Sequence, residues 1–218
     1  MRHHEDVSVW AIVVAAGRGE RFGGPKQLTP LGDRRVIDHA LGVAHDCCDG
    51  VVLVVPAGSA WGVDASAVVV GGATRSESVR AGLTAVPAGA EIVLVHDAAR
   101  PLASPGLFRR VIDAVQEGAD AAVPGVAIAD TVKQVRDGVV VATIPREDLV
   151  TVQTPQGFRV AVLRAAHATG ADGTDDAAIV ERCGGTVVVV AGDPDNVKIT
   201  EPVDLARAEM ILATRESR

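Results

Sequence analysis

The chain has 218 residues, of which 48% are hydrophobic but only 2% aromatic, and it carries a formal net charge of −7. A chain of this length can bury a full core without disulfides, so a single domain spanning residues 1–218 is the simplest prediction. The acidic balance argues against a nucleic-acid surface, and no apolar run approaches the ~18 residues of a membrane span. The three cysteines show neither metal-ligand nor disulfide spacing, which is typical of a cytoplasmic protein.

Short β-branched runs alternate with helix-length segments from the N-terminus to Val123. Their order predicts strands at residues 7–14, 51–55, 67–70, 91–95 and 119–123, and helices at residues 34–47, 76–85 and 105–117. This alternation is typical of an α/β fold in which helices cover both faces of a mostly parallel sheet, giving three layers. Ligands of such sheets bind beyond the carboxyl ends of the strands, so we expect the site in the loops that follow them.

A different pattern follows Val123. Residues 131–135 and 139–144 flank a turn of the Asp-Gly type and predict a β-hairpin. A hairpin inserted here either extends the edge of the sheet or forms an arm, at about residues 129–150, that packs on a partner subunit. The rest of the chain predicts helices at residues 160–168, 175–183 and 202–214 and a strand at residues 186–190.

The loop after the first predicted strand is rich in small residues and ends in cations, in the order Ala15, Ala16, Gly17, Gly19, Arg21 and Lys26. Backbone N–H groups can approach phosphates only where side chains are small, and cations neutralise the charge that a triphosphate brings. The spacing fits neither the P-loop nor the dinucleotide-binding fingerprint. The loop therefore predicts a phosphate site of another kind, and the alternative is a glycine-rich connection with two solvated cations.

A carboxylate follows another predicted strand directly. Asp97 comes after residues 91–95 and His96, where its oxygens could hold Mg²⁺, a cation that prefers hard oxygen ligands and keeps several waters. Asp97 could equally cap a helix or pair with Arg100, and that local ion pair would by itself explain Arg100. Metal ligation and a structural role therefore both stay open for this aspartate.

Two further segments carry candidate residues. Lys198 lies in a short strand-like stretch and would add a cation to the triphosphate site if it faced the first loop, and Asp195 could add an oxygen to the metal shell. The turn at Gly71 and Gly72 would let the backbone lie against a flat base, with Ser78 offering a polar edge. From the residues alone we expect a Mg²⁺-dependent enzyme that handles a nucleotide, most simply a transferase without covalent catalysis.

The order of the motifs resembles the 2-C-methyl-D-erythritol 4-phosphate cytidylyltransferase family over nearly the whole chain. Each motif alone has modest specificity, but seven in the same order are a strong signal. The motifs are the loop from Ala15 to Arg21 with Pro25, Lys26 and Gln27; Gly71 and Gly72 with Arg75 and Ser78; residues 96–101; Asp130 to Lys133; Thr154 to Gln156; Thr174 to Asp176; and Asp195 to Thr200.

The resemblance implies a Rossmann-like nucleotidyltransferase fold and a homodimer joined through the hairpin arm. It also implies Mg²⁺-dependent transfer of CMP from CTP to 2-C-methyl-D-erythritol 4-phosphate, which gives 4-diphosphocytidyl-2-C-methyl-D-erythritol and pyrophosphate in isoprenoid precursor biosynthesis. Two ligands are therefore expected, CTP and the acceptor phosphate.

By resemblance, catalysis and triphosphate binding fall to Arg21, Lys26 and Lys198. The cytidine and its phosphates would be lined by Ala15, Ala16, Gly17, Gly19, Gly72, Ser78 and Ala98. Methylerythritol phosphate would be bound by Asp97, Thr131, Lys133, Thr154 and Arg146, the last contributed by the arm of the partner subunit. Asp97 and Asp195 are the candidate metal ligands.

Two other functions remain open at this point. A ribitol 5-phosphate cytidylyltransferase would share the fold and most motifs, although Ala99 and the clean Thr174–Asp176 motif favour methylerythritol phosphate. A nucleotide-binding module without turnover is the candidate from a different class. Such a module would not need three cations together with a metal carboxylate.

Overall fold

A central sheet of eight strands organises the molecule. The computed structural model describes residues 7–17 and 19–216. Seven strands follow one another in the order β10-β7-β11-β6-β1-β4-β5, and β12 pairs with β7. Their bounds are β1 (Val9–Val14), β4 (Gly50–Val55), β5 (Ala67–Val70), β6 (Ile92–Asp97), β7 (Ala121–Ala127), β10 (Val150–Val152), β11 (Gln156–Arg159) and β12 (Val187–Ala191).

Most of this sheet is parallel, which confirms the predicted fold class. Strand β1 runs parallel to both β4 and β6, β4 to β5, and β12 to β7, whereas β11 and β10 run antiparallel to their neighbours. The antiparallel strands were not predicted. Strand β10 is only three residues long, and β11 begins with Gln156, the last residue of the Thr154 to Gln156 motif.

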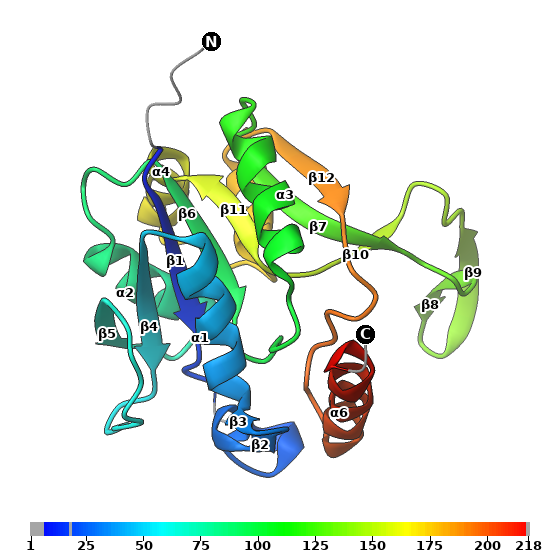
Figure 1. The fold of residues 1–218 in the computed structure, drawn as a ribbon. Helices are drawn as coiled ribbons and strands as arrows, with labels where there is room; N and C mark the ends of the chain where they lie inside the picture. The colour runs from blue at the N-terminus through cyan, green and yellow to red at the C-terminus, as the bar shows by residue number, and fades with distance from the viewer. Residues whose placement is uncertain (1–6, 18, 217–218) are drawn as a thin grey trace.

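Helices cover both faces of the sheet (Figure 1). One face packs against α1 (Val36–Cys47) and α3 (Pro105–Gln116), and the other packs against α2 (Arg75–Ala85), α4 (Val160–Ala168) and α5 (Asp176–Arg182). The closing helix α6 (Pro202–Glu216) packs on β2 (Pro30–Leu31), which pairs antiparallel with β3 (Arg34–Arg35). No helix within residues 7–17 and 19–216 is long and apolar enough to cross a membrane.

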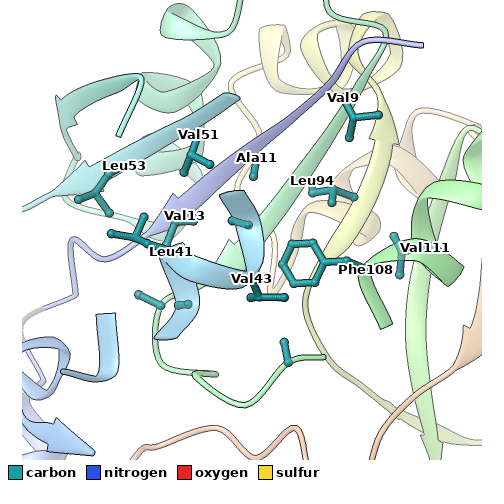
Figure 2. Packing of buried hydrophobic residues seen from close by; sticks show 14 of the residues in the cluster. Val9, Ala11, Val13, Leu41, Val43, Val51, Leu53, Leu94, Phe108 and Val111 are labelled. Carbon is teal, nitrogen blue, oxygen red and sulfur yellow. The ribbon is translucent and has the colours of Figure 1, made fainter. Parts of the chain in front are cut away.

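Alternate residues of the central strands build two separate cores. Figure 2 shows Ala11 and Val13 of β1 on the same side as Leu41 of α1 and Phe108 of α3. Ile12, between them in sequence, belongs instead to the cluster on the opposite face. Because both faces of the strand are buried, the sequence of β1 is an unbroken apolar run rather than an alternating one.

The hairpin extends away from the main sheet. Strands β8 (Val132–Arg136) and β9 (Val139–Ile144) form a two-stranded sheet of their own, and Figure 1 shows it projecting beyond the end of β7. The connecting turn uses positive φ angles, 50° at Asp137 and 78° at Gly138, as a two-residue hairpin turn requires. The predicted hairpin is confirmed, and its contact with a partner subunit stays a prediction.

Candidate functional site

Three loops meet at one edge of the sheet and enclose a cavity of about 640 Å³. They follow β1, β5 and β6, whose carboxyl ends lie together because these strands are parallel. The cavity is lined by Val14, Ala16, Gly17, Gly19, Glu20, Arg21, Lys26, Gln27, Gly72, Ala73, Thr74, Arg75, Ser78, Asp97, Ala99, Lys198 and Thr200. Four of these side chains are cationic and two are carboxylates, an excess of positive charge within an acidic chain.

A glutamine side chain fixes the backbone of the loop after β1. The Nε2 amide of the buried Gln27 donates hydrogen bonds of 2.7 Å to the carbonyl oxygen of Ala15 and 2.9 Å to that of Gly17. Gly19 has a φ of 67°, and a Cβ there would collide with the carbonyl oxygen of Gly24. The sequence analysis gave Gln27 no role, although Gln27 directly follows the predicted cation Lys26. Arg18 of this loop lies outside the described residues.

Lys26 shares the cavity with two other predicted cations. Its Nζ donates a 2.6 Å hydrogen bond to the carbonyl oxygen of Ile199, so the ammonium lies beside Lys198. Burial lowers the pKa of Lys26 below its ordinary value, and the charges of Lys198 and Arg21 lower it further. These cations repel one another in the free protein, and a bound polyanion would neutralise that repulsion.

Asp97 stands between two cations at the end of β6. Its Oδ2 accepts a 2.6 Å hydrogen bond from Lys198 Nζ, and its Oδ1 lies 3.4 Å from Arg75 Nε. Burial by itself would raise the pKa of Asp97, but Arg75 and then Lys198 more than offset it and hold that pKa well below its usual range. The carboxylate therefore carries its charge at any physiological pH.

Arg75 belongs to one of the motifs but had no predicted role, and the structure puts it in the cavity wall. It is the first residue of α2, where a cation opposes the helix dipole. Two carboxylates compensate: Arg75 Nη1 donates to Asp176 Oδ2 at 2.6 Å, and Nε faces Asp97. A cation opening a helix was the available signal that acidic partners lay nearby.

The backbone of Asp97 is fixed from behind by Thr154. The Asp97 N–H donates to Thr154 Oγ1 at 3.0 Å, and that hydroxyl lies 3.2 Å from His96 Nδ1. Because burial lowers the pKa of His96 to about 4, the ring is neutral, with Nε2 donating to the carbonyl oxygen of Arg100. Thr154 is buried behind Asp97 and lies outside the cavity lining, and its contact with the acceptor stays a prediction.

Lys198 reaches the cavity from an irregular segment, so the predicted short strand around it is wrong. This segment, between β12 and α6, docks on the loop after β6: Ile199 N–H donates to the carbonyl oxygen of Ala99 at 2.8 Å. Arg100 strengthens the same junction by donating to the carbonyl oxygen of Asn196 at 2.8 Å. The alternative in which Asp97 pairs with Arg100 is therefore wrong, because the Arg100 guanidinium donates to backbone carbonyls instead.

The turn before α2 forms the opposite wall. A Cβ on Gly71 would lie 2.5 Å from Ala16 Cβ and 2.7 Å from Ser78 Oγ, so only glycine fits. Ser78 Oγ donates to the carbonyl oxygen of Thr74 at 3.0 Å, and Thr74 caps α2 by accepting from the Glu77 N–H. These hydrogen bonds hold the turn, which contributes Gly72, Ala73, Thr74, Arg75 and Ser78 to the cavity lining.

The structure brings nine of the predicted residues into the cavity lining and leaves seven outside it. Those that line it are Ala16, Gly17, Gly19, Arg21, Lys26, Gly72, Ser78, Asp97 and Lys198. Ala15 and Ala98 are buried, Thr154 lies behind Asp97, and Thr131, Lys133 and Arg146 are exposed residues of the arm or its base. Arg146 donates to the carbonyl oxygen of Ala129 within its own chain.

Asp195, the seventh, does not join Asp97. Its carboxylate is 3.8 Å from Arg215 and lines a separate cavity beside α6. Within residues 7–17 and 19–216, no three His, Cys, Asp or Glu side chains gather as a metal cluster. Of the two carboxylates in the lining, Glu20 is exposed and Asp97 is buried as a hard oxygen donor. That donor set fits a Mg²⁺ that arrives with phosphate oxygens and water, but not a metal caged by protein alone.

Comparison with known proteins identifies the family. A family model described as 2-C-methyl-D-erythritol 4-phosphate cytidylyltransferase matches residues 9–214. The chain belongs to this family. It is 46% identical over 224 residues to the cytidylyltransferase of Saccharopolyspora erythraea, covering 95% of this chain and 100% of that one, and 48% identical to the enzyme of Streptomyces coelicolor, covering 94% and 85%.

Solved structures of cytidylyltransferases share the fold. The structure from Thermus thermophilus has a TM-score of 0.81 at 37% identity, covering 95% of this chain and 98% of that one. The 4-diphosphocytidyl-2C-methyl-D-erythritol synthase of Anaerococcus prevotii has a TM-score of 0.83 at 30% identity, covering 94% and 98%. The cavity described above therefore lies within a chain whose fold and sequence both match cytidylyltransferases.

Proposed function

We propose that this chain transfers CMP from CTP to 2-C-methyl-D-erythritol 4-phosphate, releasing pyrophosphate and forming 4-diphosphocytidyl-2-C-methyl-D-erythritol for isoprenoid precursor biosynthesis. The main support for this proposal is the match of residues 9–214 to the cytidylyltransferase family. This range contains every residue of the cavity lining. The cations of that cavity supply what a triphosphate donor requires.

The reaction needs no general base. The acceptor phosphate is already anionic at neutral pH, so one of its oxygens can attack the α-phosphorus of CTP directly while the bond to the bridging oxygen of the β-phosphate breaks. The bonding electrons leave with pyrophosphate. His96 fits this scheme because it is buried, neutral and engaged with Thr154 and Arg100, so it takes no part in proton transfer.

Catalysis then depends on position and charge. Two polyanions must meet, and negative charge grows on the leaving pyrophosphate. Arg21, Lys26 and Lys198 would hold the triphosphate from the loop and from the segment before α6, and such preorganised charges act most strongly where water is displaced. The turn at Gly71 and Gly72, which we call the glycine wall, would hold the base and ribose against the backbone.

Magnesium belongs to the same proposal. Asp97 would hold the ion together with phosphate oxygens of CTP and water, in keeping with the one buried carboxylate that the cavity lining offers. Bound there, Mg²⁺ would neutralise phosphate charge. Asp97 Oδ2 is hydrogen-bonded to Lys198 in the free protein, so the lysine would exchange this carboxylate for a phosphate when the donor arrives.

We further propose a homodimer joined through the β8–β9 arm. The arm exposes four valines, Val135, Val139, Val140 and Val141, on a two-stranded sheet that is too small to be stable alone in water. Arg146 follows β9, and in a dimer it would reach the acceptor phosphate in the partner's cavity. Thr131 and Lys133 would also contact the acceptor.

The cytoplasm is the proposed location. Cys47, Cys48 and Cys183 are all free thiols, and burial raises the pKa of Cys48 beyond its usual range. Free thiols persist in a reducing compartment, where CTP is also available.

The experiment that separates an enzyme from a binding module measures binding and turnover side by side. CTP affinity is measured by calorimetry, and pyrophosphate release is followed with Mg²⁺, with and without methylerythritol 4-phosphate. We expect binding in both cases and release only with the acceptor. Binding without release under either condition would contradict the proposal and favour a nucleotide-binding module.

A further inference from the structure

A line of alternating charges runs from the cavity into the interior. Lys198 contacts Asp97, Asp97 contacts Arg75, and Arg75 contacts Asp176. The line ends at His167 of α4, whose Nε2 lies 2.9 Å from Asp176 Oδ1. These contacts therefore join the C-terminal segment, β6, α2, α5 and α4 through side chains alone.

The inner half of this line is closed to solvent. The Asp176 side chain is 0% exposed and that of His167 is 2% exposed. Both oxygens of Asp176 are used, Oδ2 by Arg75 and Oδ1 by His167. Asp176 cannot touch a ligand in the cavity, and it reaches the site through the Arg75 guanidinium.

The two cations on Asp97 are not equivalent. The Lys198 side chain is 44% exposed on an irregular segment, whereas the Arg75 side chain is 25% exposed and is tied to Asp176 by a 2.6 Å contact. The proposed reaction draws Lys198 toward phosphate. Arg75 is the partner that would then keep Asp97 in place.

Stability does not explain why such a pair is buried. Taking two charges out of water costs about as much as their attraction returns, so a well-packed apolar pair would serve a core equally well. An arginine fork, however, fixes two carboxylates in one plane with defined directions, which neither an apolar pair nor a lysine can do. The arrangement therefore fixes the positions of the two carboxylates.

We propose that Asp176 is a positioning residue that acts through Arg75: it holds the guanidinium against Asp97 Oδ1, so that the Asp97 carboxylate keeps its orientation when Lys198 leaves it for the substrate phosphates. This inference rests on the proposed function, because it assumes that turnover uses Asp97. It assigns Asp176 and Arg75 to the reaction although only Arg75 borders the cavity.

The variants are Asp176→Asn, which keeps the shape of the side chain but removes its charge, and Arg75→Lys, which keeps the charge but loses the fork. We expect each to lower kcat about tenfold while the CTP KM changes less than about threefold. The matched control is Arg80→Lys. Arg80 lies farther along α2 and pairs with Asp172 outside the cavity. That control is expected to keep wild-type turnover.

A double-mutant cycle separates positioning from a general structural effect. If Asp176 acts through Asp97, adding Asp176→Asn to an Asp97→Asn protein lowers turnover less than about twofold further. Multiplication of the two losses would overturn the proposal. Equal thermal midpoints for Asp176→Asn and Arg80→Lys exclude loss of the fold as the cause.

A crystal structure of the Asp176→Asn protein gives a readout that needs no activity. We expect the Arg75 guanidinium to leave Asp97 or the Asp97 carboxylate to rotate, and an unchanged contact between the two would overturn the proposal. If Asp176→Asn does not fold, the same structure and cycle are carried out with Arg75→Lys. A wild-type protein that releases no pyrophosphate would refute the proposed function instead, and the crystallographic result would still decide the positioning.

Discussion

Lys26 Nζ donates a 2.6 Å hydrogen bond to the carbonyl oxygen of Ile199, which joins two segments that are 173 positions apart in the chain. The loop after β1 and the segment before α6 therefore form one unit at the cavity. This contact places the Lys26 ammonium next to Lys198, and its hydrogen-bond partner is a neutral carbonyl rather than a carboxylate. The resulting charge is available to a polyanionic donor.

Replacing Lys26 with alanine is expected to lower turnover by ~10²-fold or more, by analogy with loss of one preorganised donor to a developing negative charge. The fold should survive, because Lys26 contributes one hydrogen bond at the cavity surface. The measurement is kcat together with the thermal midpoint. Arg109→Ala is the control, since Arg109 is an exposed cation on α3, remote from the lining. Near-normal turnover of Lys26→Ala would contradict the proposed catalytic role of Lys26.

Binding of CTP should be coupled to proton uptake on the alkaline side. The pKa of Lys26 is lowered in the free protein by burial and by Lys198 and Arg21, and a bound triphosphate would raise it again. Affinity for CTP should therefore fall as the pH rises through the pKa of Lys26 in the free protein. Calorimetry in two alkaline buffers with different ionisation enthalpies measures the uptake. Identical uptake in wild type and Lys26→Ala would contradict this origin.

The glycine wall gives a steric prediction. Alanine at Gly71 would press on Ala16 and Ser78, both of which line the cavity, and we expect CTP affinity to fall about tenfold or more. The overpacking should also lower the free energy of unfolding by ~1–3 kcal/mol. Gly106→Ala is the matched control, because its Cβ would meet its nearest atom at 3.7 Å in α3 and should leave affinity unchanged. Equal CTP affinity of both variants would show that the wall does not touch the nucleotide.

Mixing two inactive variants tests whether Arg146 acts across a dimer. If each site combines Lys26 of one subunit with Arg146 of the other, a mixed dimer of Lys26→Ala and Arg146→Ala subunits contains one intact site. An equal mixture that exchanges subunits freely should then recover about a quarter of wild-type turnover. Recovery of none, with mixed dimers demonstrated by mass spectrometry, would place Arg146 in the cavity of its own chain, and full activity of Arg146→Ala alone would place it outside the reaction.

Local patterns predicted much of the framework because each strand and helix is encoded by neighbouring residues. The unbroken apolar run of β1 indicates a strand covered on both faces, and the Asp137-Gly138 turn indicates the hairpin. The family's motif order then related Arg21, Lys26, Asp97 and Lys198, which the structure brings to one cavity.

Contacts between distant segments could not be predicted in the same way. A local pair of Asp97 with Arg100 was one of the alternatives that the sequence left open, yet Asp97 binds Arg75 and Lys198, from two other parts of the chain. Asp176 belonged to one of the motifs without a predicted role, and only the structure shows that it is buried against Arg75 and His167. Asp195 was grouped with Lys198 by sequence proximity, but the backbone turns its carboxylate toward Arg215.

The identity of the acceptor is the most direct test of the proposed reaction. The protein is incubated with CTP, Mg²⁺ and equal concentrations of methylerythritol 4-phosphate and ribitol 5-phosphate, and the cytidine diphosphate products are separated and identified by mass spectrometry. We predict that 4-diphosphocytidyl-2-C-methyl-D-erythritol accumulates with an equal amount of pyrophosphate. Accumulation of the ribitol product in its place, or of neither product, would contradict the account.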